Sequence, residues 1–415
     1  MLRLSARWAL PIDAAPIARA AVLVDPSGRI GMVGPEDLVP RPPEARALDL
    51  GDAILLPGLV NTHTHLELTG FEAADPGTEF PAWIRRIRAL KEARSREAFR
   101  FAARQGLRDC WAAGVTTIAE TGDTGAAFDA LLEMGGSGVV YQEVFGPHPD
   151  QAAGSAAQLA RIVASLRSRA GGRVTVGVSP HAPYTVSAPL YRAVAAWARS
   201  EGLPLAVHLA ESDAETQLVT RGAGPFAEAW RARGIPVEFG GYRSPVDYLD
   251  ALGVLGPDTL CIHAVQVDAE DIRILADRGV AVAHCPISNQ VHGHGRAPLS
   301  AMREAGLRIG GGTDSVVSVG SLDLLAEARA ARNLGALTAA QALDLVTLGA
   351  ARSLGLEGEI GTITPGKWAD FVALLPEPGP ADPVERALSA GPDDAVLTVC
   401  GGRIVHEAAV VRDRP

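Results

Sequence analysis

The sequence predicts an α/β protein in which eight parallel strands close into a (β/α)₈ TIM barrel, joined by a small β-sandwich domain. The first observation behind this prediction lies between residues 57 and 364, where short apolar runs alternate with longer segments of helical periodicity. Strands that alternate with helices are typical of parallel sheets, and eight repeats close a barrel. The second observation is that residues 1–56 and 365–415 contain short β-like runs between turn residues instead.

The two ends of the chain are expected to pair in one composite β-sandwich domain. Residues 20–24 and 29–33 are strand candidates separated by Asp-Pro-Ser-Gly, residue types that favour turns. Further strand candidates occur at residues 370–375, 395–399 and 403–405. Because the termini of a domain often lie close together, we expect residues 1–56 and 365–415 to form this domain and residues 57–364 to form the barrel.

The barrel strands are expected at residues 54–61, 115–119, 138–145, 174–179, 205–209, 259–263, 280–283 and 308–312. Helical periodicity occurs at residues 80–112, 125–134, 152–168, 187–200, 213–220, 269–277, 298–305, 322–333 and 339–354. A long insert at residues 221–257 separates the fifth and sixth strands, and we expect it over the mouth of the barrel. In such barrels the functional side chains sit at the C-terminal ends of the strands.

Composition and charge indicate which classes of partner and which cellular compartment to expect. The net charge of −10 indicates neither nucleic-acid nor anionic-membrane binding, and we expect a small-molecule substrate instead. The first ten residues lack the apolar core of a signal peptide, and no run is long enough to span a bilayer. The four cysteines form no CxxC pair, which favours buried free thiols and a cytoplasmic protein.

His63 and His65 end the first predicted barrel strand and are the first candidate metal ligands. Residues two apart on an extended chain point to the same side, so both imidazoles project together. Imidazole is a common ligand of divalent metal ions, although this spacing alone is equally compatible with two ordinary histidines on a strand.

Further polar residues stand where later strands end, which favours a metal site. His208 closes the run at residues 204–207, and Asp314 follows the run at residues 307–313. Three imidazoles and one carboxylate can coordinate a divalent ion and leave a position for water. We assign His63, His65, His208 and Asp314 to one divalent metal ion per chain, Zn²⁺ in the first place, with Fe²⁺ or Mn²⁺ as alternatives.

Glu211 and His263 are the candidates for proton transfer. Glu211 lies three residues after His208 and is the natural general base for a metal-activated water, with a solvated carboxylate at a helix start as the alternative. His263 closes the run at residues 259–262 and is expected to face the attacking water or the charge that develops.

A second metal ion would need a bridging ligand, which the two lysines cannot supply. Lys91 falls in a predicted helix, and Lys367 falls in the C-terminal β-domain. Glu143, at the end of the third strand, is the only substitute, and its other interpretations are a substrate contact or a buried, hydrogen-bonded carboxylate. We therefore expect one metal ion.

Taken together, these motifs resemble the amidohydrolase superfamily over nearly the whole chain. The residues from Pro57 to Glu67 resemble its PG-x-[VI]-[ND]-x-H-x-H segment, and those from His208 to Glu211 resemble its H-[LVA]-[AS]-E motif. The strand-six histidine, the G-T-D-[SG] motif and the entry to the C-terminal strands are matched at residues 262–264, 312–315 and 361–370. The resemblance implies a TIM barrel with an appended β-domain, a divalent metal and a homodimer.

Two segments are similar to one branch of this superfamily. Residues 179–187 are similar to the PHAPYT-x-S segment, and residues 284–289 to the HCP-x-SN segment, of methylthioadenosine/S-adenosylhomocysteine deaminases. Aminodeoxyfutalosine deaminases and triazine chlorohydrolases belong to the same branch. The resemblance implies hydrolytic deamination at an aromatic carbon, in which Glu211 shuttles a proton to the ring nitrogen and Asp314 helps to protonate the departing ammonia. It also implies that His181 contacts the sugar or another part of the substrate.

The sequence differs from this branch at one position that concerns substrate recognition. Residues 78–83 resemble the segment where adenosine-type deaminases often carry a glutamate just before a tryptophan, and here Ala82 precedes Trp83. This difference favours a modified nucleoside such as aminodeoxyfutalosine, or another aminated heterocycle, over plain adenosine or methylthioadenosine. Trp83 is a candidate substrate contact, with packing of the core or a lid as its alternative.

Two other functions stay open at this point. A hydrolase of the same superfamily could displace another leaving group, as in a chlorohydrolase, a guanine or cytosine deaminase, or a cyclic C–N hydrolase. A catalytically silent barrel used as a binding module is the alternative outside enzymes. His292 and His294 repeat the HxH spacing in a glycine-flanked loop, where we expect two exposed histidines rather than a second metal site.

Overall fold

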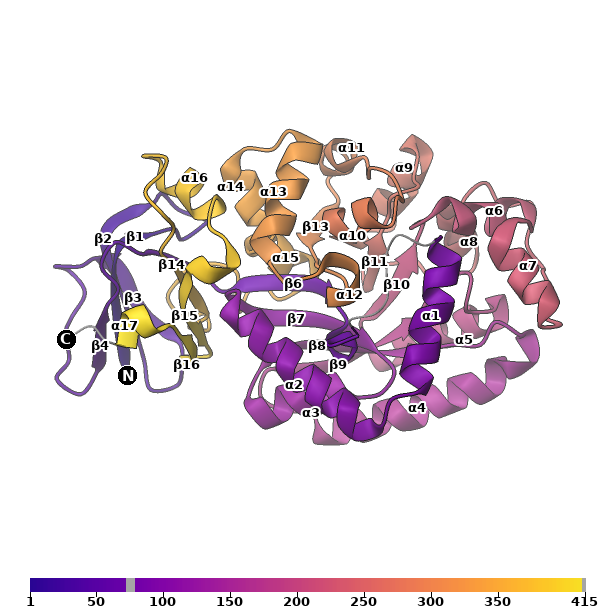
Figure 1. Ribbon diagram of the computed structural model, residues 1–415, viewed down its shortest axis with the longest axis horizontal. Helices are drawn as coiled ribbons and strands as arrows, with labels where there is room; N and C mark the ends of the chain where they lie inside the picture. The colour runs from indigo at the N-terminus through magenta and orange to yellow at the C-terminus, as the bar shows by residue number, and fades with distance from the viewer. Residues whose placement is uncertain (72–78, 413–415) are drawn as a thin grey trace.

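The computed structural model describes residues 1–71 and 79–412, and its strands form two sheets of eight strands each. Figure 1 shows one sheet, drawn from the indigo N-terminal and yellow C-terminal segments, beside a barrel surrounded by helices. The predicted TIM barrel is therefore confirmed. The domain boundaries at residues 57 and 364 stay a prediction.

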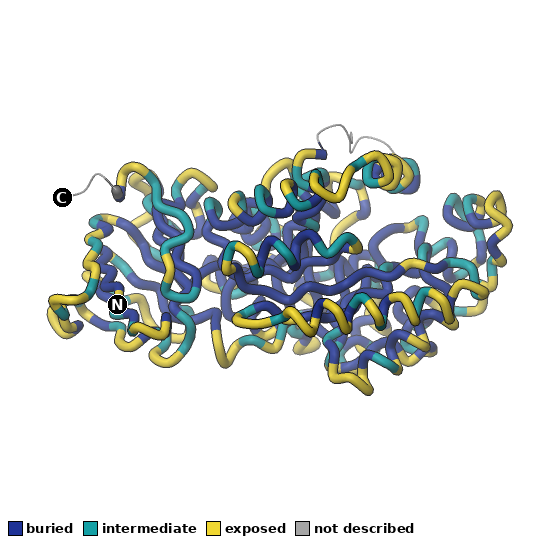
Figure 2. Tube along the Cα trace, turned by 90° about the horizontal axis from the view of Figure 1, so that it is seen from below, coloured by how far each residue is buried: buried dark blue, intermediate teal, exposed yellow. Residues whose placement is uncertain are grey.

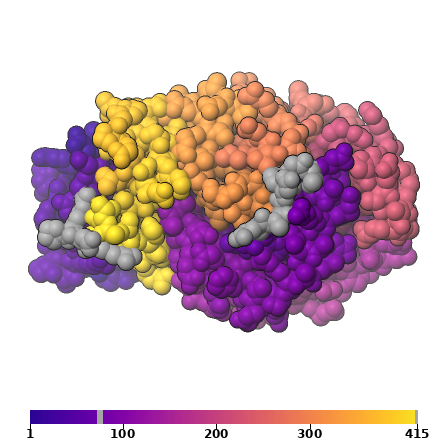
Figure 3. Space-filling view, in the orientation of Figure 1, coloured from indigo at the N-terminus to yellow at the C-terminus, as the bar shows by residue number. Residues whose placement is uncertain are grey.

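The first sheet combines strands from both ends of the chain in the order β16–β15–β14–β5–β1–β2–β3, with β4 paired to β1. Its strands are β1 (Leu2–Ala9), β2 (Ile17–Val24), β3 (Ile30–Pro35), β4 (Arg46–Asp49), β5 (Ile54–Pro57), β14 (Phe371–Leu374), β15 (Ala395–Cys400) and β16 (Arg403–Glu407). The N- and C-terminal segments meet where β5 pairs antiparallel with β14. Figure 3 shows the indigo and yellow surfaces as adjoining parts of one lobe.

Sequence reasoning missed β1 because polar residues are buried in it. The alternation of apolar and polar residues that is typical of a strand is therefore absent. Arg3 is only 2% exposed, and its guanidinium donates to the backbone oxygens of Pro40 and Glu36, each at 3.1 Å. A buried guanidinium with several acceptors is tolerated, whereas an unpaired one would be strongly unfavourable.

The run predicted as one strand at residues 54–61 is two strands in different sheets. β5 ends at Pro57 in the first sheet, and β6 (Leu59–Thr64) begins the barrel. The chain crosses at Gly58, where a Cβ atom would lie 2.2 Å from Oγ1 of Thr116. Only glycine permits this close approach, so Pro57-Gly58 passes the chain from one sheet to the other.

The barrel is a parallel sheet in the order β6 to β13. Its remaining strands are β7 (Val115–Gly122), β8 (Ser137–Val144), β9 (Val174–Pro180), β10 (Leu205–Leu209), β11 (Thr259–His263), β12 (Ala281–His284) and β13 (Arg308–Gly311). The last strand returns to the first through a bridge between Thr64 and Asp314, and the backbone N–H groups of Thr313 and Asp314 both donate to the His63 oxygen at 3.0 Å. This closure brings the end of β13 next to the end of β6.

The helices are α1 (Phe80–Glu92), α2 (Arg96–Ala112), α3 (Ala126–Met134), α4 (Ala152–Arg169), α5 (Ala188–Glu201), α6 (Asp213–Arg221), α7 (Gly224–Ala232), α8 (Pro245–Ala251), α9 (Ala269–Asp277), α10 (Pro286–Val291), α11 (Leu299–Glu304), α12 (Val316–Val319), α13 (Leu324–Gly335), α14 (Ala339–Asp344), α15 (Leu348–Ser353), α16 (Pro383–Leu388) and α17 (Ala409–Arg412). The single helix predicted at residues 80–112 is wrong, because Ser95 interrupts it. Its Oγ accepts from the N–H of Ala98 at 3.2 Å and caps α2.

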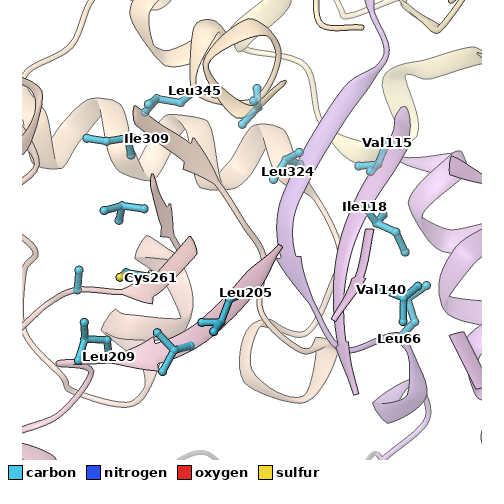
Figure 4. Close-up of a cluster of buried hydrophobic side chains, with 14 of the residues drawn as sticks. Leu66, Val115, Ile118, Val140, Leu205, Leu209, Cys261, Ile309, Leu324 and Leu345 are labelled. Atoms are coloured by element: carbon cyan, nitrogen blue, oxygen red, sulfur yellow. The ribbon is translucent and has the colours of Figure 1, made fainter. Parts of the chain in front are cut away.

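The largest core cluster lies between the barrel strands and the surrounding helices. Figure 4 shows part of it, with Val115, Val140, Leu205 and Ile309 from the strands and Leu324 from α13. Figure 2 shows the buried trace running along the strands, while exposed residues lie on the outer helices. Among the described residues, no helix is both long and apolar enough to cross a bilayer.

Candidate active site

Three histidines from two strands meet at the C-terminal end of the barrel. His63 and His65 lie on β6 and just after it, and His208 lies on β10. The ring centroid of His63 is 4.7 Å from that of His65 and 4.9 Å from that of His208. One ligand atom from each lies within 4.8 Å of the others. His63 is fully buried, and its Nε2 has no hydrogen-bond partner.

Asp314 joins this cluster from the turn after β13. Its Oδ1 lies 3.5 Å from Nε2 of both His63 and His65. The hydroxyl of Ser288 donates to its Oδ2 at 2.6 Å, and the backbone N–H of Ser315 donates to its Oδ1 at 2.6 Å. These donors fix the orientation of the carboxylate beside the imidazoles.

The protonation states of the cluster suit a cation. Burial lowers the pKa of His63 to about 4, and burial also lowers the pKa of His208 well below its usual value. Burial would raise the pKa of Asp314, but the neighbouring imidazoles, His63 first among them, bring it well below its usual value. At neutral pH the cluster therefore offers unprotonated imidazoles and an ionised carboxylate, which are the states that bind a metal ion. These residues fit a divalent ion, and their assignment as ligands stays a prediction.

Glu211 lies next to the cluster, on the turn after β10. The hydroxyl of Tyr184 donates to its Oε2 at 3.2 Å. Its Oε1 lies 3.4 Å from Nε2 of His263 and 3.3 Å from Nε2 of His294. Burial would raise its pKa, but these two imidazoles lower the pKa of Glu211 to about 2. The carboxylate is therefore ionised and able to accept a proton.

His263 and Glu211 are each held by a second residue. The Nδ1 of His263 and Oδ1 of Asn289 are hydrogen-bonded at 2.9 Å. The backbone N–H of Glu211 donates to the carboxylate of Glu215 at 2.9 Å. Asn289 and Ser288 both lie on α10, so this short helix orients both His263 and Asp314. Sequence reasoning quoted the HCP-x-SN segment without a role for either residue, although a Ser-Asn pair just after a barrel strand was a usable signal.

His181 and Glu143 form a second group beside the first. His181 stacks on His208 with ring centroids 4.5 Å apart, and its Nε2 lies 3.9 Å from Oε1 of Glu143. That oxygen is buried without a hydrogen-bond partner, and burial raises the pKa of Glu143 to about 8. Glu143, His181 and His208 also offer ligand atoms within 4.8 Å of one another. The group is thus suited to a polar part of a substrate or to a second metal ion.

Trp83 lies on α1 and faces the loop after α10. Its ring centroid lies 4.5 Å from that of His292 and 5.9 Å from that of Phe80. The expectation that His292 and His294 are exposed is wrong, because His292 is half-buried and His294 is 5% exposed. The loop turns inward against α1, which sequence spacing alone does not show.

Helix α1 is tied to the barrel by Lys91. Its Nζ donates to Oε1 of Glu67 at 2.7 Å and also to Asp123. Burial would lower the pKa of Lys91, but the charges of Glu67 and Asp123 raise it. Sequence reasoning excluded Lys91 as a metal bridge and found no other role for it, because its partners are distant in sequence.

Residues 54–405 match the amidohydrolase family. The chain belongs to this family. A 5-methylthioadenosine/S-adenosylhomocysteine deaminase from Symbiobacterium thermophilum is 32% identical over 404 residues, covering 93% of this chain and 88% of the relative. This amidohydrolase is therefore a hydrolase that acts on C–N bonds other than peptide bonds, and the family and the imidazole cluster support a divalent metal ion.

Two solved structures share the fold of this amidohydrolase. An adenosine deaminase from Xanthomonas campestris with bound zinc superimposes with a TM-score of 0.84 at 24% identity, covering 100% of this chain and 94% of that one. An aminofutalosine deaminase from Helicobacter pylori, in complex with methylthio-coformycin, superimposes with a TM-score of 0.85 at 22% identity, covering 97% and 100%.

Proposed function

We propose that this amidohydrolase is a metal-dependent deaminase of an adenine-type nucleoside or a related amino-heterocycle, and that it releases ammonia. The observation that carries the proposal is the ionised Glu211 carboxylate, buried and oriented beside a cluster of unprotonated imidazoles and Asp314. A curated relative at 32% identity is named as a deaminase of two adenine nucleosides, which supports this chemistry.

His63, His65, His208 and Asp314 would hold one divalent ion, which we propose to be Zn²⁺. A bound divalent ion would supply a nucleophile at neutral pH by lowering the pKa of water from 15.7 to about 7. The protein contributes the rest: it keeps the imidazoles unprotonated through burial and fixes Asp314 through Ser288.

The proton transfers are assigned to two carboxylates. Water adds to the carbon that bears the amino group, and Glu211 accepts the proton that the water loses. Glu211 then delivers this proton to the adjacent ring nitrogen. The added hydroxyl passes its proton through Asp314 to the amino group, the C–N bond breaks, ammonia leaves and the ring keeps the oxygen as a carbonyl. His263, with Nε2 directed at Glu211, would stabilise the charge that develops.

The substrate is held by residues around this centre. Glu143 is mostly protonated at neutral pH because burial raises its pKa to about 8, so it can donate a hydrogen bond as well as accept one. His181 offers an imidazole beside it, and Trp83 supplies an aromatic surface on the α1 side. A polar pair and an aromatic side chain around the centre suit a nucleoside, with its hydroxyl groups and flat base. We therefore place an aminodeoxyfutalosine-, methylthioadenosine- or S-adenosylhomocysteine-type nucleoside here.

Ammonia release by metal-replete enzyme tests the proposal. The panel contains adenosine, methylthioadenosine, S-adenosylhomocysteine, aminodeoxyfutalosine, guanine, cytosine and an aminotriazine, with Glu211→Gln as the inactive control. Fast turnover of one adenine nucleoside is the expected result. Silence across the panel with metal bound would overturn it, and halide release from a chlorotriazine would then assign a chlorohydrolase.

A further inference from the structure

His294 is a buried histidine to which the proposed reaction gives no role. It lies in the loop between α10 and α11, is 5% exposed, and its Nε2 has no hydrogen-bond partner that meets ordinary geometry. That atom lies 3.3 Å from Oε1 of Glu211. A buried imidazole nitrogen without a regular hydrogen bond is unfavourable, so its position against a carboxylate calls for a function.

Hydrogen bonds to both the N–H and the carbonyl oxygen of His294 hold its backbone in place. The N–H of His294 donates to the Asn289 oxygen at 2.9 Å, and the side chain of Gln266 donates to the His294 oxygen. Its neighbours Gly293 and Gly295 have φ angles of +68° and +106°, which other residues rarely adopt. The two glycines therefore allow the turn that directs the imidazole inward. The ring packs edge-on against Phe80 of α1, with centroids 4.4 Å apart.

Both carboxylate oxygens of Glu211 make polar contacts with neighbouring side chains. His263 and His294 converge on Oε1, while the Tyr184 hydroxyl donates to Oε2. A glutamate side chain has three rotatable bonds, and proton transfer requires one defined orientation of the carboxylate. An imidazole N–H at 3.3 Å from an ionised carboxylate oxygen is attracted to its charge even where the angle falls short of a regular hydrogen bond.

We propose that His294 is a positioning residue of the active site, which holds the Glu211 carboxylate in the orientation needed for its two proton transfers. This inference rests on the proposed role of Glu211. In this role His294 acts on the reaction through Glu211. Its removal leaves His263 at Oε1 and Tyr184 at Oε2, so the carboxylate is held by fewer contacts and can rotate.

His292 provides a matched comparison in the same loop. It lies two residues earlier, its Nε2 is hydrogen-bonded to Oγ of Ser318 at 3.1 Å, and its ring packs against Trp83. Its hydrogen bond goes to Ser318 instead of Glu211, so it shares the loop and the residue type without the proposed role.

The kinetic test uses His294→Leu, His294→Gln and His292→Leu, each with measured metal content. His294→Leu is expected to lower kcat by about 10- to 100-fold, with KM changed less than about threefold and metal content unchanged. His294→Gln can place an amide N–H near the position of Nε2 and should recover most of kcat. His292→Leu should keep kcat within about twofold. Equal losses in His294→Leu and His292→Leu would overturn the proposal.

A double-mutant cycle separates this inference from the proposed function. In a Glu211→Gln background, His294→Leu should lower residual kcat by less than about twofold, because both changes act on one group. The same four proteins should show non-additive shifts in Tm, a readout that needs no substrate. If no panel compound is turned over, the proposed function falls, while additive Tm shifts would by themselves overturn the contact between His294 and Glu211.

Discussion

Backbone strain marks the residues at the centre of the site. Ala210, His263 and Asp314 have φ angles of +51°, +74° and +59°, a region that residues other than glycine rarely occupy. Each lies at or directly after a barrel strand, where the chain must turn to direct a side chain into the mouth. Such conformations cost about 1–3 kcal/mol each and cluster at functional sites. At these three positions the positive φ angles accompany the turns that direct side chains into the mouth, whereas Ile12, Arg19 and Ala336 share them away from the site.

Removing either proton carrier should stop turnover while leaving the fold intact. Glu211→Gln and Asp314→Asn are each expected to lower kcat by about 10²–10⁴-fold, because general acid–base catalysis contributes that range. Both replacements keep the shape of the side chain, so circular dichroism should match that of the wild type. Near-normal turnover in either purified variant would contradict the role assigned to it.

Glu143 should make the metal-free protein less stable as the pH rises. Its carboxyl keeps a proton up to about pH 8 in the folded state, whereas the unfolded chain loses it near the ordinary value of 4.5. Between these values the unfolded state binds fewer protons than the folded state, so the free energy of unfolding falls with rising pH.

Glu143→Gln mimics the protonated carboxyl group and tests whether the free energy of unfolding falls with rising pH. The variant should gain more in Tm over the wild type at pH 8 than at pH 5, as measured by calorimetry on metal-free protein. A gain that does not change with pH would show that Glu143 is ionised in the folded state.

Two helices determine how the site is held together. Helix α10 connects the barrel centre to α13, because the backbone N–H of Ile287 donates to the Glu327 carboxylate at 3.0 Å while Ser288 and Asn289 reach Asp314 and His263. Helix α1 brings Trp83 to the mouth and is anchored at its other end by Lys91. The site therefore depends on the attachment of short helices as well as on the strands.

Lys91→Met should destabilise the protein and raise KM. It leaves Glu67, which is 1% exposed, without its cation. Thr124 still donates to the carboxylate and the Lys91 side chain is partly exposed, so the expected loss is about 1–3 kcal/mol. Urea unfolding and steady-state kinetics measure the two effects. Arg88→Ala on the same helix is the control, because Arg88 and its partner Glu92 are both exposed and such pairs contribute at most about 1 kcal/mol. Equal losses of stability in the two variants would contradict the anchoring role.

At the scale of the whole molecule, the chain is an amidohydrolase whose two ends share one sheet. β5 pairs with β14 within this sheet. From β5 the chain continues through Gly58 into β6, the first strand of the barrel. The homodimer implied by the family stays a prediction, which light scattering of the purified protein would test.

Metal content is the decisive whole-molecule measurement. We expect about one divalent ion per chain by elemental analysis, and chelation should lower Tm because a ligand that binds only the folded state stabilises it. A content near two per chain would assign a second ion to Glu143, His181 and His208. Unchanged Tm after complete chelation would contradict a metal bound within the barrel.

The sequence by itself determined the barrel and the positions from which the central side chains emerge. Strand periodicity and the polar residues that end each run were enough, because a parallel strand directs its last side chains to one end of the barrel. Short β-like runs at both ends of the chain also indicated the composite sheet, although β1 and β4 were missed. These features are local, so they can be read from neighbouring residues.

Only the tertiary structure decided which residues hold the central ones in place. Tyr184 and His294 contact Glu211 from segments 27 and 83 positions away along the chain, and Ser288 contacts Asp314 across 26. The crossing at Gly58 and the inward turn of the loop at His294 likewise depend on contacts elsewhere in the chain, whereas the break at Ser95 has a local cause in its cap on α2. Spacing along a sequence predicts which side chains a strand directs to the mouth of the barrel. The contacts that orient those side chains depend on how separate elements pack.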